Sequence, residues 1–282
     1  MPPPIPPERP GRTAGQDDSD PPPQAVGRPL FKIELPHLSS RTESFDAYLA
    51  LAAAPDAPGI VVIPEALGRD EDLPAMCQRW AADGFHALGP DLLWRHPRPP
   101  ARPPAESATP PLPEAPVPPH PHYGFDVDQG VNDLQVAIDW LAGMDSSHGA
   151  RRRVGCVGYG LGGVLSYRAA VYGRLDASVV YYATGVERFL DEVHTPDCPM
   201  LMHVAGKDEA ASPGDRHRMA QTLSARPATQ LYLYPQAPHG FARLAGPQRE
   251  PAAADLADQR SRDFLARHLR QRQGARPGGE VR

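Results

Sequence analysis

Short apolar runs alternate along this chain with segments that have the periodicity of helices. Beyond an N-terminal strand pair at 30–35 and 44–51, the runs expected to form strands are 59–64, 85–91, the run that ends at Gly158, 177–182, 199–206 and 230–235. Strands that are apolar along their whole length are typical of sheets covered on both faces. The alternation therefore predicts an α/β fold with a mostly parallel central sheet flanked by helices on both faces.

The segments between these runs are predicted to form helices. The clearest has apolar residues on one face of a helix, and they are Val127, Val131, Leu134, Ile138 and Leu141. Further helices are expected over 70–84, directly after Gly163, around 216–223 and within 253–269. In a parallel sheet the chemistry lies at the carboxyl ends of the strands, so we expect a site in the loops that follow Pro64, Gly158, Val204 and Tyr234.

Proline divides the chain into a core and its appendages. The 37 prolines crowd residues 2–29 and 97–121, and such segments neither donate regular backbone hydrogen bonds nor bury much apolar area. We expect a disordered tail at 1–28, one domain at 29–271 that carries an insertion at 97–121, and a flexible tail at 272–282. Rapid proteolysis in the tail and the insertion, with an intact core, would support this division.

The motif "GYGLGG" at 158–163 connects an apolar run to a predicted helix. A strand, a tight glycine turn and a helix is the place where many hydrolases carry a Ser or Cys nucleophile. Here Gly160 stands at that position. The glycines around it predict room for a side chain there.

Two further polar residues follow separate predicted strands. Asp208 lies in "AGKDEAAS" after the run at 199–206, and His239 lies in "PQAPHGFAR" after the run at 230–235. The order elbow, acid, histidine is that of α/β-hydrolases, in which the acid orients the imidazole and stabilises its charged form. Asp208 alone could equally be a turn or helix-capping residue, and His239 alone is one of 11 histidines and could be structural. The pair in this order indicates a catalytic origin.

The motifs "VGYGLGGVLSYRAA", "HVAGKDEAASP" and "YPQAPHGFAR", with "VVIPEALG" and "ALGPDLLWR" at the matching places, resemble the dienelactone hydrolase family of α/β-hydrolases. The resemblance extends from about residue 30 to about 268, interrupted by the Pro-rich insertion. It implies an elbow of the form G-x-C-x-G-G with a cysteine nucleophile, an aspartate and a histidine. Asp208 and His239 match the acid and the base, whereas Gly160 replaces the cysteine.

The resemblance assigns three further roles. Glu65 matches a glutamate that holds and activates the resting thiol, and Arg243 matches an arginine that binds the substrate carboxylate. In this fold the oxyanion hole uses backbone N–H groups, here those of Leu161 and Ala66.

A second substrate-binding arginine of the family falls in the region of the insertion. Arg95 and Arg102 are only nearby candidates for it, which leaves the substrate open.

Other interpretations of the elbow are weaker. Gly158, Gly160 and Gly163 satisfy the dinucleotide pattern G-x-G-x-x-G, but no acidic residue ends the next strand. As displaced nucleophiles, Tyr159, Cys156 and Ser166 are all poorly placed by the sequence.

Two functions stay open. One is hydrolysis of a small carboxylate-bearing lactone or ester, weak or absent because Gly160 has no nucleophile. The other is a non-catalytic pseudo-hydrolase that binds a small ligand or a partner through the retained pocket.

Composition excludes several classes of function. A net charge of −5 gives no indication of a nucleic-acid partner, and no apolar run is long enough for a membrane helix. Cys77, Cys156 and Cys198 form no closely spaced pair, so we expect free thiols, no metal site and no other cofactor. The first residues lack an apolar signal core. We therefore expect a cytoplasmic monomer whose partner is a small molecule.

Overall fold

The computed structural model describes residues 28–36, 43–65, 72–96, 124–144, 151–173, 175–192, 198–244 and 247–270. The predicted insertion at 97–121 and the tail at 272–282 lie outside the described residues, as does the predicted tail at 1–28 apart from its last residue. Ala66 and Arg102 also lie outside them.

Eight strands form one sheet in the order β1-β2-β4-β3-β5-β6-β7-β8. The strands are β1 Leu30–Pro36, β2 Ser44–Ala50, β3 Gly59–Ile63, β4 His86–Pro90, β5 Val154–Tyr159, β6 Ala177–Tyr181, β7 Met200–Lys207 and β8 Thr229–Pro238. Strand β2 pairs antiparallel with β1 and with β4, whereas the other neighbours are parallel. The predicted mostly parallel sheet is confirmed, and the N-terminal strand pair forms its antiparallel edge.

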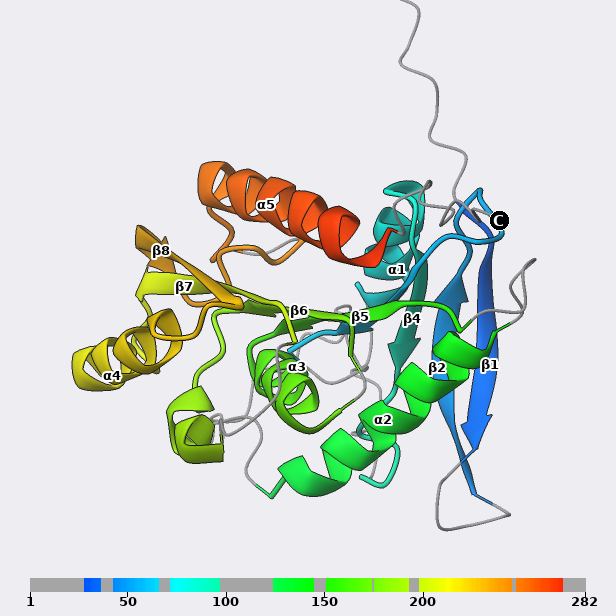
Figure 1. The fold of residues 1–282 in the computed structure, drawn as a ribbon, viewed down its shortest axis with the longest axis horizontal. Helices are drawn as coiled ribbons and strands as arrows, with labels where there is room; N and C mark the ends of the chain where they lie inside the picture. Colours follow the sequence, from blue (N-terminus) through cyan, green and yellow to red (C-terminus); the bar gives the residue numbers. More distant parts are fainter. Residues whose placement is uncertain are drawn as a thin grey trace, which may run out of the picture.

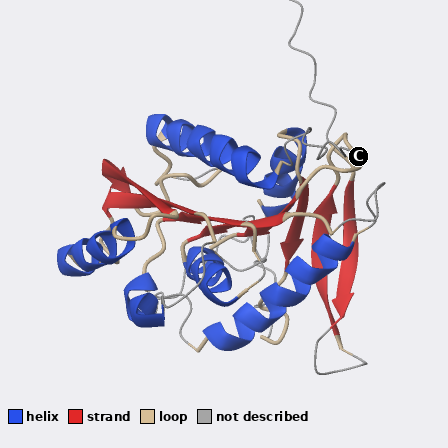
Figure 2. Cartoon of the chain, viewed as in Figure 1, coloured by secondary structure: helices blue, strands red, loops and turns tan. Residues whose placement is uncertain are grey.

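Helices cover both faces of this sheet. They are α1 Leu73–Ala82, α2 Val127–Gly143, α3 Leu161–Tyr172, α4 Pro213–Ser224 and α5 Pro251–Leu269, with a 3-10 helix η1 at Val186–Glu192. Figures 1 and 2 show α1 and α5 on one face and α2, α3 and α4 on the other. The predicted helices are confirmed, and η1 is an addition that the sequence pattern did not indicate.

Two apolar cores follow from this layering. Every residue of β3, β5 and β6 is buried, as strands between two helical layers require.

Helix α2 begins where the Asp126 carboxylate accepts the backbone N–H groups of Asp128 and Gln129, each at 3.0 Å. Helix α4 begins in the same way at Ser212, whose hydroxyl accepts the N–H of Asp215.

The topology gathers five loops at one edge of the sheet. Strands β3, β5, β6, β7 and β8 are consecutive parallel neighbours, so the segments that follow their carboxyl ends lie along the same edge. Glu65 is the second residue of the segment after β3, and the other four segments begin with Gly160, Tyr182, Asp208 and His239. The fold therefore brings Glu65, Gly160, Asp208 and His239, which the sequence singled out, to one edge of the sheet.

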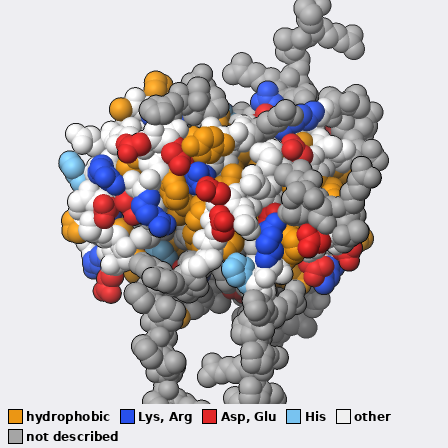
Figure 3. Space-filling model, turned by 90° about the horizontal axis from the view of Figure 1, so that it is seen from below, with side chains coloured by type: hydrophobic (Ala, Val, Ile, Leu, Met, Phe, Trp, Pro, Cys, Tyr) orange, Lys and Arg blue, Asp and Glu red, His pale blue; other side chains and the backbone are white. Residues whose placement is uncertain are grey.

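The charges on one face of the molecule are mixed. On the face seen in Figure 3, acidic and basic side chains of the described residues are interspersed. No helix within the described ranges is long and apolar enough to cross a membrane.

Candidate active site

Gly160 forms a sharp turn between β5 and α3. It has φ 54° and ψ −119°, and its N–H donates to the carbonyl of Tyr181 at 3.0 Å. A residue with a side chain is strained at such a positive φ, whereas glycine adopts it freely. This strand–turn–helix geometry is that of the nucleophile elbow of α/β-hydrolases.

Backbone packing explains the other glycines of the motif. A Cβ on Gly158 would overlap the backbone of Gly162, and a Cβ on Gly162 would overlap the carbonyl of Ile63. A Cβ on Gly163 would lie 2.8 Å from the side chain of Ala183. The pattern G-x-G-x-x-G is therefore accounted for by the close approach of α3 to the sheet, with no need of a dinucleotide.

The acid and the histidine meet at the carboxyl edge. Asp208 follows β7, His239 follows β8, and Nδ1 of His239 lies 2.8 Å from Oδ2 of Asp208. The Asp208 carboxylate also accepts the N–H of Ala210 at 3.0 Å and the hydroxyl of Thr184 at 3.3 Å. Only 5% of the Asp208 side chain is exposed, so these contacts fix its orientation.

Glu65 lies on the other side of the same imidazole. Its Oε1 is 3.1 Å from Nε2 of His239, and its Oε2 accepts hydrogen bonds from Nε of Arg243 at 3.1 Å and from Nη2 of the same guanidinium. Asp208, His239, Glu65 and Arg243 therefore form a continuous row in which negative and positive groups alternate.

The partners of His239 determine its protonation. Both ring nitrogens face carboxylates, which only accept hydrogen bonds, so the ring donates from both nitrogens as an imidazolium. Burial alone would lower the pKa of His239, but the hydrogen bonds and charges of Asp208 and Glu65 outweigh it and raise the pKa to about 9.

The same contacts act on Glu65 in the opposite direction. Burial alone would raise its pKa, but His239 and Arg243 outweigh burial and lower the pKa to about 2. Both groups are therefore charged at neutral pH.

The Glu65 side chain occupies the space beside the elbow. An ideal Cβ on Gly160 would lie 2.6 Å from Cγ and 3.0 Å from Cδ of Glu65. The expectation of room for a side chain at residue 160 is therefore wrong. Backbone atoms occupy the space beside Gly158 and Gly162, and the Glu65 side chain occupies the space beside Gly160.

Tyr182 is a residue of the site that the sequence reading missed. It has φ 36°, the one positive φ among the described residues other than glycine. Its ring packs edge-on against His239 at a centroid distance of 5.1 Å and against Phe241 at 5.5 Å. Its position directly after β6, beside the elbow strand, is the signal that could have identified it.

Arg216 of α4 is a second residue that the sequence reading missed. Its Nη1 donates to the carbonyls of Asp208 at 2.8 Å and Ala211 at 2.5 Å. It therefore closes the loop that carries the acid, and its sequence context, one of many arginines on a predicted helix, gave no signal.

The two halves of the expected oxyanion hole differ in what the structure describes. Leu161 is the first residue of α3, and no acceptor for its N–H is found among the described residues. That donor therefore remains available at the elbow. Ala66 lies outside the described residues.

The displaced nucleophiles considered from the sequence are buried elsewhere. Cys156 is fully buried in the core, and its burial raises the pKa of the thiol. The Ser166 hydroxyl lies 2.9 Å from that of Ser178. Burial likewise raises the pKa of the Tyr159 phenol. None of the three takes the place beside His239 that Glu65 fills.

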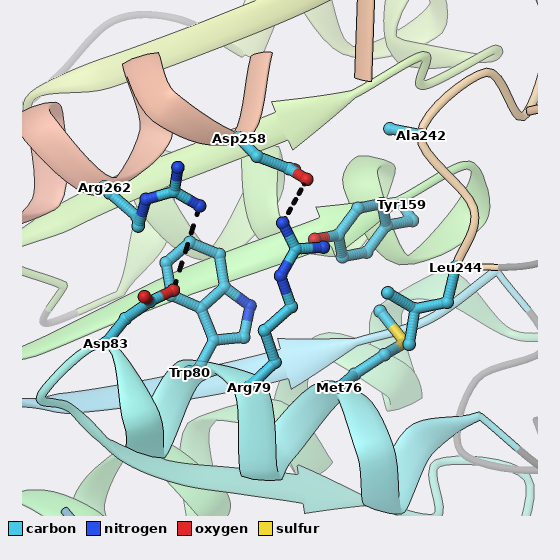
Figure 4. Close-up of a pocket in the computed structure, with 9 residues that line it drawn as sticks. All are labelled: Met76, Arg79, Trp80, Asp83, Tyr159, Ala242, Leu244, Asp258 and Arg262. Atoms are coloured by element: carbon cyan, nitrogen blue, oxygen red, sulfur yellow. Dashed lines mark hydrogen bonds and ion pairs between the residues drawn. The ribbon is translucent and has the colours of Figure 1, made fainter. Parts of the chain in front are cut away.

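A pocket between α1 and α5 lies behind the elbow strand (Figure 4). Arg79 extends from α1 to Asp258 of α5, with 2.5 Å between Nη2 and Oδ2, beside the ring of Tyr159. Asp258 also accepts the hydroxyl of Tyr181 at 3.0 Å, and the rings of Tyr181 and Tyr159 stack at 4.6 Å. This ion pair between half-buried Arg79 and buried Asp258 ties both helices to the ends of β5 and β6, which is a structural role.

The candidate second arginine also has structural partners. Both terminal nitrogens of Arg95 pair with Asp133 of α2, which additionally accepts the Trp94 indole N–H at 2.9 Å. Among the described residues, no group of three or more His, Cys, Asp or Glu side chains could hold a metal ion.

Comparisons with known proteins agree with this geometry. A sequence model of the dienelactone hydrolase family matches residues 45–269. The chain is 31% identical over 223 residues to the carboxymethylenebutenolidase of Pseudomonas putida, which covers 79% of this chain and 91% of that protein. It is 31% identical over 234 residues to a putative carboxymethylenebutenolidase of Azospirillum brasilense, which covers 80% of this chain and 94% of that protein.

Solved structures show the same fold. A putative dienelactone hydrolase from Klebsiella pneumoniae superimposes with a TM-score of 0.64 at 21% identity, over 84% of this chain and 99% of that one. The dienelactone hydrolase-like promiscuous phosphotriesterase P91 from metagenomic libraries gives a TM-score of 0.65 at 17% identity, over 86% and 99%. These likenesses establish an α/β-hydrolase fold. Together with the sequence match over most of its length, they show that this chain belongs to the dienelactone hydrolase family.

Proposed function

We propose that this protein hydrolyses a small lactone or ester that carries a carboxylate, at a site in which Gly160 stands at the nucleophile position. The observation that carries the proposal is the hydrogen-bonded pair of His239 and Asp208 beside the elbow, at 2.8 Å. Such a pair positions an imidazole for proton transfer. The N–H of Leu161 supplies one donor to an oxyanion, and we assign the other to Ala66.

Arg243 is the proposed carboxylate-binding group. An arginine binds a carboxylate through two parallel donors, and 41% of the Arg243 side chain is exposed, so a ligand can reach it. The name of the curated relatives denotes a butenolide with a carboxymethylene group, which is a lactone that carries a carboxylate. It supports this substrate class for the present chain.

No acyl-enzyme forms at residue 160, because glycine has no nucleophilic group. The oxygen that attacks the carbonyl comes from water or from another side chain. His239 can accept a proton only after it loses its own, and its pKa of about 9 opposes that loss at neutral pH. Activity is therefore expected to be weak compared with a hydrolase that has its thiol.

A second candidate is a non-catalytic protein that binds a small carboxylate through the same residues at the carboxyl edge of the sheet. The observation that favours it is the engagement of His239 by carboxylates at both nitrogens, together with the Glu65 side chain beside the elbow. Here Arg243 would hold the ligand, and the row of charges would serve binding alone.

The experiment measures hydrolysis of lactones and p-nitrophenyl esters with and without a carboxylate. The wild type is compared with His239→Gln, Arg243→Ala and, as a control, Arg267→Ala, an exposed arginine in the last turn of α5. We expect His239→Gln to abolish steady-state hydrolysis. Arg243→Ala should raise KM for carboxylate-bearing substrates by about 10- to 150-fold, the equivalent of a charge-assisted hydrogen bond of about 1.5–3 kcal/mol.

The outcomes separate the two candidates. If the wild type and all variants hydrolyse the substrates no faster than buffer alone does, hydrolysis is excluded. Calorimetric binding of a small carboxylate that is lost in Arg243→Ala would then support the binding protein.

We further propose that the protein is a cytoplasmic monomer with one domain at 29–271 and a Pro-rich insertion at 97–121. Size-exclusion chromatography with light scattering tests the monomer, and cell fractionation tests the location. Limited proteolysis tests the insertion: protection of 97–121 as strong as that of 154–172 would contradict it.

A further inference from the structure

We propose that Glu65 is the nucleophile of this site, and that its carboxylate attacks the substrate carbonyl in place of the side chain that residue 160 lacks. This inference rests on the proposed function, since it names the attacking group of that hydrolysis. The sequence offered Tyr159, Cys156 and Ser166 as replacements, and the structure buries all three elsewhere.

The first argument is position. A Cβ on Gly160 would point toward Glu65, whose Cγ and Cδ would lie only 2.6 and 3.0 Å from it. The carboxylate thus lies where the reactive atom of an elbow residue would lie. Its Oε1 is 3.1 Å from Nε2 of His239, the hydrogen bond that a hydrolase nucleophile makes with its histidine.

The second argument is the order of groups behind that oxygen. His239 is held at its other nitrogen by Asp208 at 2.8 Å, and Asp208 is only 5% exposed. Glu65, His239 and Asp208 therefore form a nucleophile–histidine–acid arrangement, with three separate loops of the carboxyl edge supplying the three groups.

The third argument is chemical. A serine or cysteine needs a base to remove its proton, whereas a carboxylate with a lowered pKa is already ionised and needs none. The charged His239 is then correctly protonated for the opposite task, which is to donate a proton to the leaving group. The protonation state that hinders water activation is thus the one that attack by Glu65 requires.

The first step forms a mixed anhydride. Oε1 of Glu65 bonds to the carbonyl carbon, and the oxyanion accepts the N–H of Leu161. Collapse of this intermediate breaks the bond to the leaving oxygen, which takes the Nε2 proton of His239 and departs as an alcohol, or as the opened end of a lactone.

The second step restores the enzyme. Neutral His239 removes a proton from water, and the hydroxide attacks the anhydride. The products are the substrate acid and the Glu65 carboxylate, and His239 is again an imidazolium. The sum is one ester and one water converted to one acid and one alcohol, with no other reactant.

The experiment compares Glu65→Gln and Glu65→Asp with the wild type and with Glu209→Gln, an exposed glutamate beside Asp208. Gln keeps the shape of the side chain without a nucleophilic carboxylate, and Asp withdraws the carboxylate from the elbow by one methylene. With a p-nitrophenyl ester we expect kcat/KM to fall on the order of 10³-fold in Glu65→Gln. It should fall less in Glu65→Asp and not at all in Glu209→Gln. Circular dichroism confirms that each variant is folded.

A trapping experiment observes the intermediate. In His239→Gln the good leaving group p-nitrophenolate departs without an acid, but no base remains for the second step. We expect a burst of one p-nitrophenolate per protein, and hydroxylamine added at the burst should leave a hydroxamate that mass spectrometry maps to Glu65. Glu65→Gln, alone or combined with His239→Gln, should show no burst.

The pH profile separates attack by Glu65 from attack by water. The groups that face His239 are the carboxylates of Asp208 and Glu65 and the ring of Tyr182, and Arg243 is paired with Glu65 behind them. With a poor leaving group, the acid role predicts a kcat/KM that is flat at neutral pH and falls above about 9, whereas a base role toward water predicts a rise toward 9.

Full activity of Glu65→Gln would overturn the nucleophile and leave the proposed hydrolysis standing. Absence of hydrolysis by the wild type across the panel would overturn both.

Discussion

Replacing Gly160 by alanine tests whether Glu65 really occupies the elbow. The substitution adds one methyl group at a backbone with φ 54°, 2.6 Å from Cγ of Glu65. Cγ is in the middle of a side chain whose carboxylate is anchored by His239 and Arg243, so it cannot simply swing aside.

The expected loss in the free energy of unfolding of Gly160→Ala has two parts. A residue other than glycine in such a backbone conformation costs about 1–3 kcal/mol, and overpacking a filled site costs about 1–3 kcal/mol more. The free energy of unfolding of Gly160→Ala should therefore be about 2–6 kcal/mol lower than that of the wild type. In a Glu65→Ala background only the backbone part remains, so the two substitutions should couple by about 1–3 kcal/mol.

The assay is urea unfolding of the wild type, both single variants and the double variant. Gly143→Ala is the matched control, because its Cβ would meet nothing within 4 Å and its backbone has no positive φ. Because Gly143 is the last residue of α2, the alanine should leave stability unchanged or raise it by up to about 1 kcal/mol. A Gly160→Ala variant as stable as Gly143→Ala, or additive effects in the cycle, would refute the placement of Glu65.

Three further predictions use the same groups. Because the pKa of His239 is raised from 6.5 to about 9, its contribution to stability is complete below pH 6.5 and is lost as the pH rises through about 9. The free energy of unfolding should then fall by about 3 kcal/mol over that range, and a fall that persists in His239→Gln would assign it to another group. Cys77 and Cys198, whose burial raises the thiol pKa of each to about 12, should react with Ellman's reagent far more slowly than in urea-unfolded protein, and rapid labelling in native buffer would contradict that burial. Gly160→Cys should hydrolyse activated esters well above the wild-type rate and only with His239 present, while it loses stability as Gly160→Ala does; a folded variant with no gain would count against the elbow as a catalytic position.

Local patterns were sufficient for the fold. Strands such as Gly59–Ile63 are buried along their whole length, and the apolar stripe from Val127 to Leu141 has the period of one helix face. Burial on both faces and helical amphipathicity both produce patterns of apolar residues over short stretches of sequence. The types of the elements and the parallel sheet could therefore be predicted. η1 could not, because a seven-residue 3-10 helix has too few turns to leave a period.

The sequence also determined which groups could reach the site. Chain order and the ends of apolar strands placed Asp208 and His239 at one edge, since the carboxyl ends of parallel strands lie together. The resemblance to the family added Glu65 and Arg243, because their role depends on motifs and not on any local period.

Only the tertiary structure decided how these groups are paired. Glu65 and His239 are 174 residues apart in the chain, and they follow β3 and β8, between which β5, β6 and β7 lie in the sheet. Their contact therefore depends on how the loops at the carboxyl edge reach across it. The same is true of Tyr182 and Arg216, whose contacts with His239 and Asp208 no local pattern marks. The sequence specified an elbow without a nucleophile, whereas the space beside Gly160, and the carboxylate that fills it, result from packing between distant segments.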